Sequence, residues 1–187
     1  MKNNNLSNTS YLVALLCLLM GTISCSEGDI ITVELEFDGV LDNCANTNAN
    51  TFVFYKLNSA NTKTLLLNFT ETNFDLIPDS KKLANVETVL LNQTTNLVTY
   101  REFSASINPS SYFCSDIPPK ENTTTLEYTS TSGTAEISYD FLRTEATDSI
   151  FKRTIVLRDI TLIGDAIAYR KEFLALGEQE VVKTFTP

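Results

Sequence analysis

Apolar and polar side chains alternate one by one along residues 31–38, so Ile31 and every second residue up to Phe37 fall on one side of an extended chain. Strict alternation predicts a β-strand in a sheet that buries one face. Less regular runs of the same kind recur along the chain, separated by polar segments. The pattern predicts strands at 31–38, 51–57, 64–69, 86–91, 96–103, 124–129, 134–142, 150–163 and 181–185.

Three pairs of these runs are joined by short segments that favour a reversal of the chain. The joining segments are 58–61 (Asn-Ser-Ala-Asn), 93–95 (Gln-Thr-Thr) and 132–133 (Ser-Gly). Asn and Ser form turns through side-chain hydrogen bonds to the backbone, and Gly accepts the backbone angles that tight turns need. We therefore expect three β-hairpins.

The C-terminal third is less regular. The alternation in strand 150–163 slips near Asp159, which predicts a bulge or a bend between two sheets. Residues 166–176 fit a short helix or a strand equally well, and Gly177 should end that element. Many short strands with few helix signals predict an all-β fold, an antiparallel β-sandwich, with a β-barrel as the alternative. One domain over 30–187 accounts for this length.

The N-terminal segment has a different character. Residues 11–20 carry no charge, but they are too few for a membrane-spanning helix, which needs about 20 apolar residues. A run of this length suits the core of a signal peptide. Ser24 precedes Cys25, and the pair resembles a bacterial lipobox, in which the cysteine thiol receives a diacylglycerol before cleavage. Thr22 replaces the usual leucine of that motif, so ordinary signal cleavage before Cys25 is the alternative.

The residues after Cys25 form a short acidic patch of Ser26, Glu27 and Asp29. This patch resembles the export signal of Bacteroidota lipoproteins, which implies an outer-membrane protein facing the cell exterior. A solvated tether is the simpler interpretation. We expect a signal peptide at 1–24, and a lipidated cysteine with an acidic tether at 25–29, so that the protein contacts the membrane through its lipid anchor.

Two longer stretches extend the resemblance. The sequences SEGDIITVELEFD and FVFYKLNSANTKTLLLNF, separated by a loop that contains Cys44, are similar to those of small flavobacterial lipoproteins of unknown function. The similarity covers the first part of the mature chain and consists of patterns of strands and loops. It implies a surface lipoprotein and transfers no active-site residue.

Cysteine parity supports the lipid anchor. The chain has Cys17, Cys25, Cys44 and Cys114, and Cys17 would leave with the signal peptide. If Cys25 carries lipid, Cys44 and Cys114 remain as a pair in an oxidising compartment, and we expect a disulfide between them. The bond would close a loop of about 70 residues, worth roughly 4 kcal/mol in the chain-entropy model, and would fasten the long loop 104–122.

Charge and absent residue types narrow the chemistry. The formal net charge is −9, which disfavours nucleic acid as a partner. The chain has no His, so Ser-His-Asp and Cys-His catalysis are excluded, as is the commonest metal ligand. Asp38, Asp42 and Asn43 could offer oxygens to calcium, but their spacing matches no EF-hand loop and suits a turn. We expect no metal site and no cofactor.

Three constellations could carry chemistry, each with a simpler structural explanation. Tyr100 to Glu102 and the pair Tyr112–Phe113 could hold a sugar or a carboxylate, or Tyr100 could be core and Phe113 could pack under the disulfide. The segment 34–38 carries three carboxylates on one strand face, as in β-sandwich glycosidases, or simply a solvent face. Arg170 to Glu172 suit an exposed face.

These features predict a lipid-anchored, cell-surface binding or structural module that is not an enzyme. Its ligand, a glycan or a protein, is not specified by the sequence. The alternative is a carboxylate-dependent glycan hydrolase, which would need two Asp or Glu residues about 5–10 Å apart across a cleft.

The first testable prediction concerns Cys25. Cys25→Ala should move the protein from the membrane fraction to the soluble fraction and abolish labelling by a radioactive or clickable fatty acid, because the thiol that carries the lipid is gone. Labelling that persists in this variant would exclude the anchor.

The matched control keeps Cys25 and removes the acidic patch through Glu27→Ala with Asp29→Ala. This variant should stay in the membrane fraction but resist protease added to whole cells, because export rather than anchoring is lost. Equal digestion of the wild type and this variant would show that the patch is only a tether.

Overall fold

The computed structural model describes residues 35, 37–44, 52–70, 83, 85–115, 117, 119–120, 123–164 and 168–184. The chain divides into two units, Met1–Ile30 and Ile31–Pro187, and every described residue lies in the second. The predicted signal peptide, Cys25 with its tether, and most of strand 31–38 therefore lie outside the described residues. Within the described ranges, no helix is long and apolar enough to cross a membrane.

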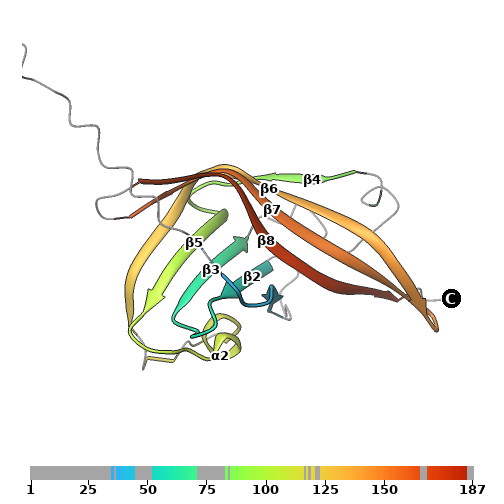
Figure 1. The fold of residues 1–187 in the computed structure, drawn as a ribbon, viewed down its shortest axis with the longest axis horizontal. Helices are drawn as coiled ribbons and strands as arrows, with labels where there is room; N and C mark the ends of the chain where they lie inside the picture. The colour runs from blue at the N-terminus through green and yellow to red at the C-terminus, as the bar shows by residue number, and fades with distance from the viewer. Residues whose placement is uncertain are drawn as a thin grey trace, which may run out of the picture. The chain divides into compact units, whose positions relative to one another are not determined.

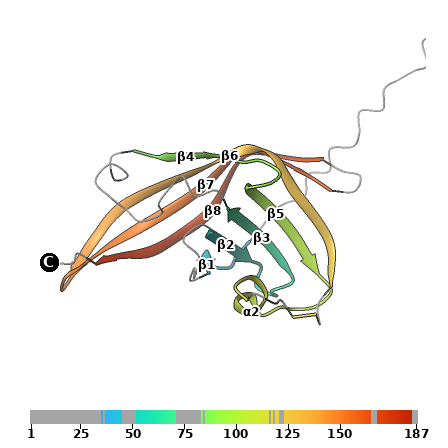
Figure 2. The same ribbon diagram turned by 180° about the vertical axis from the view of Figure 1, so that it is seen from behind.

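The described strands form one antiparallel sheet of eight strands that curls into a half-barrel (Figures 1 and 2). The strands are β1 Asp42–Asn43, β2 Phe52–Leu57, β3 Lys63–Phe69, β4 Glu87–Leu90, β5 Asn96–Phe103, β6 Thr124–Glu145, β7 Asp148–Ile163 and β8 Ala168–Thr184. They are ordered β1-β2-β3-β5-β6-β7-β8, with β4 paired to β6. The antiparallel all-β prediction is confirmed. The two-sheet sandwich is not, because these strands share one continuous sheet.

The curl depends on a bend in the long strands, which run side by side in Figure 1. The predicted hairpin over 124–142 is wrong, because β6 passes through Ser132 and Gly133 without reversing. Gly133 has φ +129°, and the register between β6 and β7 shifts on both sides of Ser132. Across from it, Asp159 on β7 has φ +50°. The predicted bulge at Asp159 is confirmed, and paired bulges bend both strands together.

The second predicted hairpin is also wrong. Both β4 and β5 pair with β6, β5 along its first part and β4 along Thr134 to Ile137. In the connecting loop, the Asn92 side-chain oxygen accepts the N–H groups of Thr94 and Thr95 at 2.8 and 2.7 Å. The loop therefore interrupts one edge of β6 at its bend instead of folding β4 back on β5.

The other elements agree better with the pattern. The hairpin of β2 and β3 is confirmed, and the Asn58 side-chain oxygen closes its loop by accepting the N–H groups of Thr62 and Lys63, each at 2.9 Å. Residues 168–176 are strand rather than helix. Gly177 does not end this strand, because β8 continues to Thr184 with a register shift against β7 at Ile155.

Both faces of the central strands are buried. Leu65 and Leu67 point into the concave core, whereas Leu66 between them joins a second cluster on the convex face. Neighbouring residues of a strand point to opposite faces, so this continuous apolar run serves two cores. The largest fully buried side chains of the concave core include Phe54, Phe69, Ile137, Ile155, Leu157 and Leu162.

The bend predicts a large effect of a small substitution. Gly133→Ala should lower the free energy of unfolding by roughly 1–3 kcal/mol, because a side chain at φ +129° is strained and its Cβ would lie 2.9 Å from the Arg158 carbonyl oxygen. Urea unfolding measures the change. The neighbouring exposed residue provides the control, and Ser132→Ala should stay within about 0.5 kcal/mol of the wild type. Equal stability of the two variants would contradict this account of the bend.

Candidate functional site

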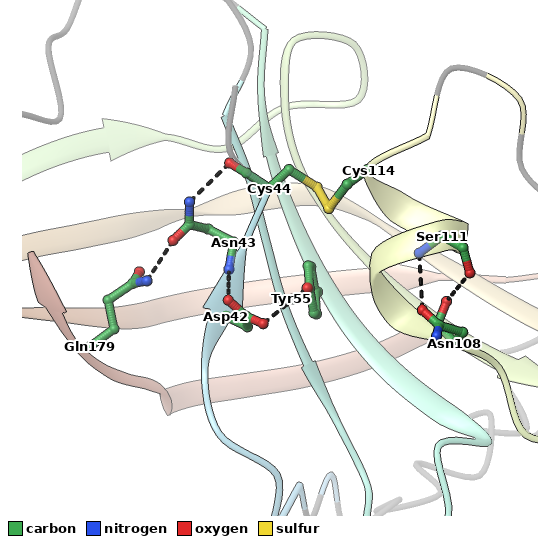
Figure 3. The surroundings of a disulfide bond; sticks show 8 residues. All are labelled: Asp42, Asn43, Cys44, Tyr55, Asn108, Ser111, Cys114 and Gln179. Carbon is green, nitrogen blue, oxygen red and sulfur yellow. Dashed lines mark hydrogen bonds between the residues drawn. A yellow bond between two sulfur atoms is a disulfide. The ribbon is translucent and has the colours of Figure 1, made fainter. Parts of the chain in front are cut away.

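The disulfide between Cys44 and Cys114 is present, as the sequence predicted, with their Cα atoms 5.2 Å apart (Figure 3). Cys114 directly follows α2, Pro109–Phe113, the one helix of the described residues. Asn108 caps this helix by accepting the N–H of Ser111 at 3.1 Å, and proline suits its first turn. The bond therefore fastens the long loop to the end of β1.

The fastened loop covers the convex face of the sheet. The ring centroid of Phe113 lies 5.2 Å from that of Tyr55 on β2, and the ring of Tyr112 lies 4.9 Å from Phe103 on β5. The structural interpretation of Phe113 is thus confirmed. The Tyr100 and Phe113 sites do not meet, because Tyr100 belongs to the concave core and Phe113 packs against the convex cluster.

Side chains also connect the two edges of the sheet. The guanidinium of Arg153 on β7 donates to Gln179 at 2.6 Å, Gln179 donates to the side chain of Asn43, and Asn43 donates to the Cys44 carbonyl at 2.9 Å. Figure 3 shows the last two links. Arg153 is buried and lies 4.7 Å from the ring centroid of Phe54, and this burial lowers its pKa. The chain of contacts holds the curl of the sheet.

The residues considered and set aside as calcium ligands make hydrogen bonds within the protein. Asp38 accepts the N–H of Ser59 at 2.7 Å, and Asp42 accepts the hydroxyl of Tyr55 at 3.1 Å. Burial, followed by that hydrogen bond, raises the pKa of Tyr55 to about 12. Over the described ranges, no cluster of His, Cys, Asp and Glu is arranged to hold a metal ion. Asp42 and Asn43 form strand β1, so the turn interpretation is wrong for these two residues, whereas Asp38 lies beside a bend at Gly39.

The concave side of the half-barrel contains a cavity of about 90 Å³, which we call the tyrosine cavity. Its walls come from β5, β6, β7, β8 and the segment before β1. They consist of Tyr100, Tyr128, Tyr169, Glu102, Leu35, Leu126 and Leu162. Tyr100 and Tyr128 are direct cross-strand neighbours, and so are Leu162 and Tyr169. A row of side chains across four strands thus forms the floor of one site.

The backbone at Gly164 lies close to the ring of Tyr128, which forms one wall of the cavity. A Cβ at Gly164 would lie only 2.6 Å from the ring of Tyr128, so the ring occupies space that any other residue would fill. The ring centroids of Tyr100 and Tyr128 are 6.0 Å apart with their planes inclined by 49°. At that angle the two rings do not stack face to face, and the ring of Tyr100 also packs against that of Phe37, with centroids 6.1 Å apart and planes inclined by 70°.

Glu102 is the acidic residue of this cavity, and two neighbours keep it ionised. The Tyr100 hydroxyl donates to Oε1 of Glu102, and Nζ of Lys63 lies 3.0 Å from the same oxygen. The hydrogen bond from Tyr100 lowers the pKa of Glu102 most, and Lys63 lowers it further. In turn, burial and the contact with Glu102 raise the pKa of Tyr100. The pair is therefore a carboxylate with a neutral phenol at neutral pH.

The sequence identified parts of this site but not the whole. The prediction that Tyr100 is buried is confirmed, and Leu126 and Tyr128 pack against the concave core as their alternation indicated. Arg101, grouped with Tyr100 by sequence, instead pairs with Glu127 outside the cavity. The role of Glu102 was missed, although its position two residues after Tyr100 already placed both on one face.

No protein-family model, curated protein or solved structure matches this chain. The function therefore has to be inferred from the geometry of the site.

The coupling of Tyr100 to Glu102 can be tested by titration. Because its folded-state pKa is lowered, Glu102 contributes stability above its ordinary pKa of 4.5, and this contribution is lost as the pH falls through the folded value. Tyr100→Phe should raise the Glu102 pKa and reduce that acid-dependent loss. At neutral pH it should cost about 1.5 kcal/mol, the low end for a hydrogen bond to a charged group, since the Glu102 side chain is 30% exposed.

Carbon-detected NMR of the Glu102 carboxyl measures the pKa, and urea unfolding from pH 7 to pH 3 measures the stability. Lys63→Gln is the matched control and should raise the Glu102 pKa by less, because its contribution is smaller. An unchanged Glu102 titration in Tyr100→Phe would exclude the coupling.

Proposed function

We propose that this chain is a lipid-anchored binding module displayed at the outer face of an outer membrane, where it captures a small ligand in the tyrosine cavity. The lipobox-like Ser24-Cys25 supports the anchor, and Ser26 with the acidic residues Glu27 and Asp29 supports export to the surface. The resemblance to flavobacterial surface lipoproteins belongs to the same proposal. The module acts by holding its ligand near the cell, with the membrane as its support.

The tyrosine cavity is the single observation that carries this proposal. A sheet needs only well-packed apolar side chains to bury its concave face, yet here tyrosines and a carboxylate surround a space that the described side chains leave open. A cavity with mostly apolar walls and a few fixed polar groups is the usual form of a small-molecule site. Its small volume favours a ligand, or a protruding group of one, over an extended glycan or a protein surface.

The alternative, a carboxylate-dependent glycan hydrolase, has less support. Such an enzyme needs a proton-donating acid, whose pKa is raised, facing a second carboxylate. Among the described residues that line the cavity, Glu102 is the sole acidic one, and its pKa is lowered. Glu34 and Glu36 lie outside the described residues. A fixed, ionised carboxylate that already accepts a hydrogen bond suits recognition better than proton transfer.

The proposal predicts that binding can be blocked by filling the cavity. In a screen of small organic molecules by methyl NMR, binders should shift the methyl signals of Leu126 and Leu162, which line the cavity. Leu126→Trp should abolish these shifts, because the larger ring occupies the space. On β4, Leu90 is 72% exposed, and Leu90→Trp should leave binding unchanged. A screen in which no binder depends on Leu126 would overturn the proposal.

A further inference from the structure

We propose that the tyrosine cavity binds a small alkylated ammonium cation, such as a trimethylammonium group. This inference rests on the proposed binding function and specifies its ligand class. It is carried by the tyrosine rings, the ionised carboxylate, the small volume and the mostly apolar walls, which favour the same chemistry for different reasons.

The rings supply the first attraction. The face of an aromatic ring carries negative potential and attracts a cation within about 6 Å of its centroid. Tyr100, Tyr128 and Tyr169 reach the cavity from three different strands, β5, β6 and β8. Tyr100 and Tyr128 contact each other directly and are inclined rather than stacked, so a group that lies beside the pair can contact both rings. Several rings around one space form an aromatic cage, which is a recurrent site for alkylated ammonium groups.

Glu102 supplies the second attraction. Its contacts with Tyr100 and Lys63 are both made at Oε1, which leaves Oε2 without a partner among the described residues. The Lys63 side chain is 47% exposed, and an ion pair with such an exposed amine is weak. The carboxylate therefore keeps negative charge to offer to a ligand in the cavity. The net charge of −9 adds a long-range attraction for cations.

Size and polarity decide between cations. The cavity of about 90 Å³ lies well below the roughly 300–1,000 Å³ of sites for drug-sized ligands, so it admits only a small group. A bare ammonium carries three donors that need acceptors, and a metal ion needs several oxygens. The leucine side chains that line the cavity offer neither acceptors for the ammonium donors nor oxygens for a metal ion. Methyl groups around the nitrogen remove its donors and present an apolar surface to Leu126 and Leu162.

The same argument disfavours a sugar ring. Tyrosine faces can stack on a sugar, but each sugar hydroxyl that enters the cavity needs a hydrogen-bond partner, and an unpaired buried donor costs about 1–3 kcal/mol. Glu102 and the tyrosine hydroxyls are too few for a ring of hydroxyls. A neutral sugar also gains nothing from the charge of Glu102.

The test compares two probes of nearly identical shape. Choline carries a trimethylammonium group, and 3,3-dimethyl-1-butanol replaces its nitrogen with carbon and is neutral. Isothermal titration and methyl NMR are performed on the full-length chain in a maltoside detergent, which has no ammonium headgroup. Choline should bind roughly tenfold or more tightly than the alcohol, since only choline gains from the rings and from Glu102.

Three variants assign the effect to the cavity. Glu102→Gln should weaken the binding of choline roughly tenfold without changing the affinity for the alcohol. Glu127→Gln is the matched control on the adjacent strand, because Glu127 pairs with Arg101 outside the cavity, and it should leave choline unchanged. Lys63→Gln removes the competing cation and should increase the affinity for choline several-fold. A misfolded variant would not show such an increase.

The outcomes separate this inference from the proposed function. Equal affinity for choline and the alcohol would overturn cation recognition and leave a binding module with an apolar preference. Absence of choline binding, while other compounds still bind in a Leu126-dependent way, would do the same. Failure of every compound to bind in the cavity would overturn both proposals.

Discussion

The length of β6, β7 and β8 is the constraint on which the rest of the structure depends. These strands have 22, 16 and 17 residues, several times the usual strand length of about 5–6. Flat strands of that length would bury one face only against a second sheet. Here the bulges at Gly133 and Asp159 bend them instead, so the sheet covers its own concave face. The concave core and the tyrosine cavity both follow from that bend.

The local pattern of the sequence identified most strands, but it predicted the pairing of β2 with β3 correctly and two other hairpins wrongly. Ser132 and Gly133 suit a hairpin turn as well as a bulge, since both need a residue that accepts positive φ. The choice depends on β4 and β7, which lie on either side of the bend and are distant in sequence. The prediction of a hairpin turn at 93–95 was wrong for the same reason. Turn chemistry specifies a local backbone shape, and the neighbouring strands decide how that shape is used.

The candidate site was predictable in parts. Cysteine counting predicted the disulfide on the expectation that Cys17 leaves with a signal peptide and Cys25 carries lipid. The apolar run from Leu65 to Leu67 already signalled burial on both faces, and hence a covering element on the convex side. The tyrosine cavity could not be predicted from the sequence, because it needs Tyr169 from β8 beside Tyr100 from β5. That proximity arises from the strand order and the bend, which no sequence window contains.

The outermost strand has a further consequence. Among the described strands, β8 pairs only with β7, and on its other side Gln179 contacts Asn43 of β1 through their side chains. Arg170, Lys171 and Glu172 are exposed along it, as the sequence predicted. A strand added there would have to place its own side chains beside these charges, and charged residues on an edge strand disfavour such pairing. The charged residues of β8 therefore disfavour edge-to-edge association of two copies of this chain.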